Sequence, residues 1–146
     1  MTILSAPAEL RDLLARARTI AVVGLSGDPA RDSHSVASYL VAHGYRVIGV
    51  NPNEERVLGE TCYPSLESLP EDLRREVDIV DVFRRPEAAL GVARSAAELR
   101  FPAIWFQLGV ATPEAIAEAD RAGLSVVSGR CIKTAHLLLR PGREAR

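Results

Sequence analysis

The chain has 146 residues, of which 47% are hydrophobic and 25% are charged, and its formal net charge at pH 7 is −1. This balance fits one globular domain with a substantial core, and it argues against nucleic acid or an anionic membrane as the main partner. We find no apolar run long enough to cross a bilayer and no secretory signal pattern, so we expect a cytoplasmic protein.

The cysteines and histidines do not form a metal-binding or disulfide pattern. Cys62 and Cys131 lie far apart, and the three histidines, His34, His43 and His136, do not have the spacing of a zinc motif. We therefore expect neither a disulfide framework nor a bound metal.

Helical and strand patterns alternate along the chain. A helix is expected after Pro7, a second one capped by Asp32 or Ser33 and ended by Gly44, and further helices near 71–76, 86–100, 113–122 and after Arg130. Apolar runs at 19–24, 45–50, 78–83, 103–108 and 124–129 predict five strands, and a brief further strand is expected near 61–63. The alternation predicts an α/β, Rossmann-like, doubly wound domain covering 1–146, with a mainly parallel sheet of about five strands and helices on both faces.

Ligands of such sheets bind outside the carboxyl ends of the strands. This rule directs attention to four places where an apolar run stops, namely 24–33, 51–53, 83–86 and 107–109.

The first of these places begins TIAVVGLSGDP, at residues 19–29. A dinucleotide fingerprint that started at Gly24 would need glycines at the positions of Ser26 and Pro29. Backbone amides of the turn, which includes Leu25, together with the hydroxyls of Ser26 and Ser33 and the guanidinium of Arg31, instead predict a phosphate site at a helix N-terminus. The alternative is an ordinary loop whose polar residues cap a helix, but a cap does not require the arginine.

The second place reads Val50-Asn51-Pro52-Asn53, where an NAD-binding unit would carry Asp or Glu for the ribose. Glu54 comes only after the proline, so NAD is disfavoured, although Asn51 is able to hydrogen-bond a ribose. The alternative is a plain turn at Asn51-Pro52.

The third and fourth places combine aromatic, cationic and amide groups. Phe83 would lie against an adenine ring, and Arg84 and Arg85 beside a helix N-terminus would form an anion-binding corner. The alternative is that Phe83 is a core residue followed by solvated arginines. Gln107, close to Gly109, either lines the cleft or is a satisfied edge residue.

Cys131 and Lys133 follow the last predicted strand. A reactive thiol would need the electropositive setting that Arg130 and Lys133 offer, but an inert, buried cysteine is the favoured interpretation.

The ordered set of segments resembles a known family, the small stand-alone CoA-binding proteins of the YccU-like type. Their Rossmann domain is shared with succinyl-CoA synthetase alpha subunits and ADP-forming acyl-CoA synthetases. The matching segments cover almost the whole chain after residue 18: AVVGLSGDPARDSHSVASYLVAHGYRVIGVNP, YPSLESLP, DIVDVFRRPE, IWFQLGV and GRCIKTAH. One departure is Gly129 before Arg130-Cys131, where relatives often carry an acidic or amide residue.

The resemblance implies that coenzyme A binds through its 3′-phospho-ADP part. Carried over by position, the residues that would bind the phosphates are Gly24, Ser26, Arg31 and Ser33. Asn51 and Pro52 would border the nucleotide, and Phe83, Arg84 and Pro86 would flank it. Gln107 and Gly109 would line the far side of the cleft.

The resemblance also bears on catalysis. The synthetase relatives act through a phosphorylated histidine in a later domain that this sequence does not show, so we expect a CoA- or acyl-CoA-binding module without catalysis of its own. The alternatives are a nucleotide-dependent oxidoreductase, one subunit of a split ADP-forming acyl-CoA synthetase, or a regulatory domain that reads CoA or redox state through Cys131. A protein partner or a homo-oligomer remains open.

Overall fold

The computed structural model describes residues 2–142. Seven strands form one sheet in the order β3-β4-β2-β1-β5-β6-β7. Their bounds are β1 Thr19–Val23, β2 Arg46–Val50, β3 Arg56–Val57, β4 Glu60–Tyr63, β5 Ile79–Val82, β6 Ala103–Phe106 and β7 Ser125–Val127. Every pairing between these strands is parallel except that of the β3–β4 hairpin.

The predicted Rossmann-like α/β class is confirmed, but the sheet has seven strands where about five were expected. The two strands beyond these five form the β3–β4 hairpin at one edge; β4 corresponds to the brief strand expected near 61–63, and β3 was not expected. β3 has only two residues and one of them is exposed, so it leaves no apolar run in the sequence.

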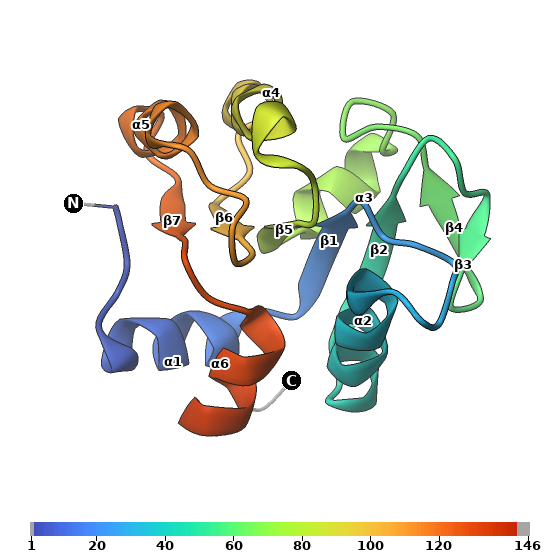
Figure 1. Cartoon of the computed structure of the whole chain (residues 1–146), viewed down its shortest axis with the longest axis horizontal. Coiled ribbons are helices and arrows are strands. Elements are labelled where there is room, and N and C mark those ends of the chain that lie inside the picture. The colour runs from blue at the N-terminus through green and yellow to red at the C-terminus, as the bar shows by residue number, and fades with distance from the viewer. Residues whose placement is uncertain (1, 143–146) are drawn as a thin grey trace.

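Helices cover both faces of the sheet, as Figure 1 shows. α1, α2 and α6 pack on one face, and α4 and α5, with α3 beside them, pack on the other. Their bounds are α1 Pro7–Arg16, α2 Asp32–Ala42, α3 Glu71–Glu76, α4 Pro86–Glu98, α5 Pro113–Arg121 and α6 Ile132–Leu139. None of the helices in 2–142 has the length and apolarity needed to cross a membrane.

The central strand β1 is buried at all five positions, because helices pack on both of its faces. Ile20 and Val22 point into one hydrophobic cluster, and Ala21 and Val23 point into the other. Such alternation follows from the two-residue period of a strand.

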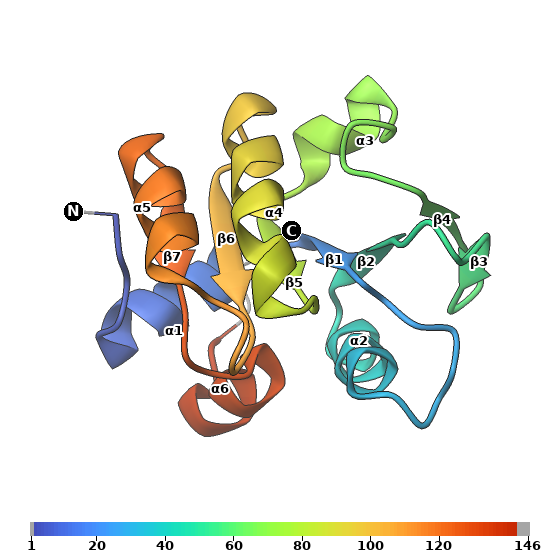
Figure 2. The same cartoon turned by 45° about the horizontal axis from the view of Figure 1, so that its top comes forward.

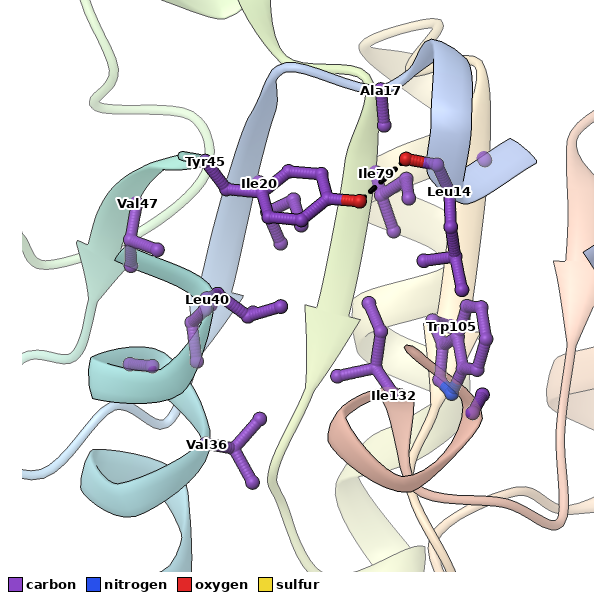
Figure 3. Packing of buried hydrophobic residues seen from close by; sticks show 14 of the residues in the cluster. Leu14, Ala17, Ile20, Val36, Leu40, Tyr45, Val47, Ile79, Trp105 and Ile132 are labelled. Atoms are coloured by element: carbon purple, nitrogen blue, oxygen red, sulfur yellow. Dashed lines mark hydrogen bonds between the residues drawn. The ribbon is translucent and has the colours of Figure 1, made fainter. Parts of the chain in front are cut away.

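Trp105 and Ile132 lie together in the first cluster, where α6 meets the sheet (Figure 3). The indole Nε1 of Trp105 donates a hydrogen bond of 3.0 Å to the carbonyl oxygen of Arg130. This bond fixes the loop that leads into α6, and it thereby places the start of that helix beside the end of β6.

The chain order places the switch point between β1 and β5. β1 lies between β2 on one side and β5 on the other, so the connections that follow β1 and β5 leave the sheet toward opposite faces. The long segment between β1 and α2 swings outward beside the β3–β4 edge before α2 begins (Figure 2). A sheet of this kind opens a crevice at its switch point.

Candidate functional site

A cleft of about 1040 Å³ opens at the carboxyl ends of β1, β2, β5 and β6, between the first turns of α2 and α6. It is large enough for a nucleotide with an extended substituent. Its lining includes many of the residues that the sequence predicted as a site: Gly24, Ser26, Arg31, Ser33, Asn51, Pro52, Phe83, Arg84 and Gln107.

Three predicted residues are not among those that line the cleft. Leu25 is 1% exposed and packs in the core, so only its backbone would be available to a ligand. Pro86 is the first residue of α4, and Gly109 lies in the exposed turn after β6. Their place in a site stays a prediction, like that of the lining residues.

Gly24 directly follows β1 and has a φ of +89°, a conformation that favours glycine. A Cβ built on it would lie 1.9 Å from the carbonyl oxygen of Phe83. The glycine therefore permits the close approach of the chain after β5, and this packing alone explains why no larger residue stands there.

The serine hydroxyls of the β1–α2 segment bond to the protein itself. The Oγ of Ser33 accepts a hydrogen bond of 3.0 Å from the amide of Ser26, and the Oγ of Ser26 accepts one of 3.0 Å from the amide of Asp28. Both hydroxyls thus shape the segment, a role that the sequence prediction did not distinguish from direct contact with a phosphate.

The start of α2 differs from the prediction. Arg31, and not Asp32 or Ser33, is the N-cap residue, and no side chain among the described residues caps the helix. A side-chain cap would have satisfied amides of the first turn. Asp32, Ser33 and Ser35 of this turn line the cleft, so the positive end of the α2 dipole is directed at it.

Asn51 acts as a brace between two strand ends. Its Nδ2 donates a hydrogen bond of 3.0 Å to the carbonyl oxygen of Leu25, and its Oδ1 accepts one of 2.9 Å from the amide of Asn53. The turn after β2 is thereby attached to the segment after β1.

The turn that Asn51 braces returns Glu54 to the cleft. The Oε2 of Glu54 accepts a hydrogen bond of 2.8 Å from the amide of Gly27. Glu54 was not predicted as a site residue, because it comes after Pro52 and the direction of the turn is not readable from the sequence.

Gln107 connects the floor of the cleft to a buried acid. Its Nε2 donates a hydrogen bond to Oδ1 of Asp81, and its Oε1 accepts one of 3.4 Å from the amide of Ile132 at the start of α6. Asp81 is 0% exposed, and its Oδ2 has no hydrogen-bond partner within the described part of the chain. Burial raises the pKa of Asp81 to about 8, while the bond from Gln107 acts in the opposite direction.

Asp81 was not among the residues predicted from the sequence. Its signal was an acidic residue in the middle of the apolar run DIVDVF, in a strand that an α/β sheet covers on both faces. A carboxyl group in such a place must be neutral or hydrogen-bonded. Asp81 meets both conditions, because burial favours its neutral form and Gln107 donates a hydrogen bond to it.

The charged groups of the lining favour an anionic ligand. Four cationic side chains face two acidic ones, and they are Arg31, Arg84, Arg85 and Lys133 against Asp32 and Glu54. In residues 2–142 no group of three or more His, Cys, Asp or Glu side chains is arranged to hold a metal ion.

Cys131 and His34 occupy different surroundings. Cys131 lines the cleft and is the N-cap residue of α6, partly exposed and not fully buried as the favoured interpretation held. The Nδ1 of His34 lies 3.4 Å from the Oγ of Ser38 one turn along α2, and His34 is not among the lining residues.

The fold and the cleft define an α/β protein of the Rossmann-like class with a crevice at its switch point, lined by more cationic than acidic side chains. Within that class, residues 18–137 match the family described as "CoA binding domain", and the chain belongs to this family. The family predicted from the sequence segments is confirmed.

Similar proteins support the assignment. "Uncharacterized protein YneT" of Bacillus subtilis (strain 168) is 40% identical over 129 residues, which are 88% of this chain and 93% of that protein. A "hypothetical protein from Pyrococcus horikoshii OT3" is 37% identical with a TM-score of 0.87, and 93% of each chain is covered.

A more distant likeness shows the fold alone. The "dinucleotide forming Acetyl-coenzyme A synthetase 1" of Ca. Korarchaeum cryptofilum is 21% identical with a TM-score of 0.64, over 79% of this chain and 26% of the synthetase.

Proposed function

We propose that this protein binds coenzyme A or an acyl-CoA through the 3′-phospho-ADP part, in the cytoplasm and without catalysis of its own. The observation that carries the proposal is the cleft of a CoA-binding domain in which the uncapped start of α2 and four cationic side chains converge. The pyrophosphate would lie at the β1–α2 segment, because amides and a positive helix end stabilise anions there.

The remaining parts of the ligand follow from the lining. Phe83 is partly exposed beside the arginines that follow β5, so it offers an apolar surface for the adenine ring. The thiol or thioester end would extend toward Gln107 and Cys131, which also line the cleft.

Calorimetric titration with coenzyme A, dephospho-CoA, NAD and ADP tests the proposal. We expect coenzyme A to bind most tightly and to raise the unfolding temperature, since a ligand that binds only the folded state stabilises it. Binding of NAD without binding of coenzyme A would contradict the proposal.

Replacing Arg31 identifies the phosphate end. We expect Arg31→Ala to weaken coenzyme A binding about tenfold and to make it less sensitive to salt, because one charge–phosphate contact is lost. Arg121→Ala is the matched control, because Arg121 is an exposed arginine at the end of α5, away from the cleft lining. Equal affinities of the two variants would remove Arg31 from the site.

A nucleotide without a 3′-phosphate, such as NAD, is the second candidate. It is favoured by one observation, namely that Glu54 lies in the cleft after β2, where NAD-binding domains carry an acidic residue for the ribose. If Glu54 has that role, Glu54→Gln weakens NAD binding, which the same titrations measure.

A further inference from the structure

The carboxylate of Glu54 occupies a position that suits a phosphate oxygen. It accepts the 2.8 Å hydrogen bond from the amide of Gly27, in the segment that joins β1 to α2. A Cβ built on Gly27 would lie 2.8 Å from Oε1 of Glu54, so the carboxylate lies directly over this residue. Phosphate oxygens and carboxylates recognise backbone amides by the same chemistry.

The neighbouring amides are satisfied differently. The amides of Ser26 and Asp28 donate to the serine hydroxyls of Ser33 and Ser26, which are neutral groups. Among the amides of residues 26–28, the one of Gly27 therefore donates to a carboxylate, which comes from another part of the chain.

The turn after β2 holds Glu54 in this position. Asn51 is hydrogen-bonded to Leu25 and to the amide of Asn53, and the amide of Glu54 donates a bond of 3.3 Å to the carbonyl oxygen of Asn51. The carboxylate is thus presented to the β1–α2 segment by a braced turn, and it is half-buried, whereas the next residue, Glu55, is exposed.

We propose that the Glu54 carboxylate competes with a ligand phosphate for the segment that joins β1 to α2, and that it thereby sets the affinity of the cleft for phosphate-bearing ligands. A pyrophosphate reaches the amide of Gly27 only after the carboxylate has left it, and the two negative groups repel each other while both are in the cleft. The inference rests on the proposed function for the identity of the ligand, but the competition itself concerns any pyrophosphate.

Glu54→Gln tests the competition, because glutamine keeps the length and an acceptor oxygen and removes the charge. Glu55→Gln is the matched control, since it removes an equal charge from the adjacent, exposed position. We expect the Kd for coenzyme A to fall about tenfold in Glu54→Gln and to stay unchanged in Glu55→Gln, the size that one like charge near a partly hydrated site produces. The gain should shrink as salt is raised, because salt screens the repulsion.

Inorganic pyrophosphate is titrated into the unmodified protein and into the Glu54→Gln and Glu55→Gln variants. This experiment separates the inference from the proposed function. Tighter pyrophosphate binding by Glu54→Gln supports the competition even if none of the proteins binds coenzyme A, in which case the proposed function is the part that fails. Equal or weaker binding of both ligands by Glu54→Gln, or no binding of either ligand by any of the proteins, overturns the competition. Equal thermal midpoints of the three unliganded proteins show that the fold is retained.

Discussion

We expect Asp81 to make the stability of this protein depend on pH, and Asp81→Asn to remove that contribution. The side chain is 0% exposed at the middle of β5, and it accepts a hydrogen bond from Gln107. Asparagine has nearly the same shape as the protonated acid and still accepts that bond, but it does not titrate.

The magnitude follows from the pKa. Burial raises the pKa of Asp81 from 3.8 in a model compound to about 8 in the folded protein. Above pH 4 the unfolded chain loses this proton while the folded protein retains it. The stability that the neutral carboxyl allows is therefore complete below pH 4 and is lost as the pH rises toward 8. Each pH unit in this range changes the free energy of unfolding by ~1.4 kcal/mol, or about 3 kcal/mol between pH 5 and pH 7.

Urea unfolding followed by circular dichroism at pH 5, 6, 7 and 8 measures the effect. We expect Asp81→Asn to gain stability relative to the unmodified protein by about 3 kcal/mol from pH 5 to pH 7, and little more above pH 8. Asp72→Asn is the control, since Asp72 is exposed on α3. Other titrating groups contribute equally to both proteins and cancel in the difference. A difference that is constant with pH would refute the assignment of a neutral, buried Asp81.

Two further predictions concern packing, and the first has a control substitution. Gly24→Ala should cost at least ~3 kcal/mol in chemical denaturation, because φ is +89° and the new Cβ would lie 1.9 Å from the carbonyl oxygen of Phe83. Gly109→Ala, with φ +75° and no atom within 4 Å of its Cβ, should cost about 1 kcal/mol, and equal losses would contradict the role of the close contact. Tyr39→Phe should lower the free energy of unfolding by about 1 kcal/mol, because it removes the 2.8 Å bond between the Tyr39 hydroxyl of α2 and Nδ1 of His136 on α6. Unchanged stability in the same denaturation experiment would show that this bond does not hold the two helices together.

The sequence by itself determined the class of fold and the region of the cleft. Runs such as 20–23 and 103–106 are apolar throughout because a parallel sheet is covered on both faces, and a glycine lies at or near the point where each stops. Parallel strands present their carboxyl ends at one edge, so residues as distant as Arg31 and Gln107 were expected in one place, and both line the cleft. The β3–β4 hairpin was missed as a pair, because a two-residue strand is too short to show a period.

Only the tertiary structure decided the partner of each polar group. Glu54 bonds to an amide 27 positions earlier, and Gln107 bonds to a carboxyl group 26 positions earlier. Hydrophobic periodicity is a local consequence of burial and is therefore visible in a short segment. The partner of a carboxylate or an amide depends on distances between segments that meet only when the sheet has formed, and no local pattern records those distances.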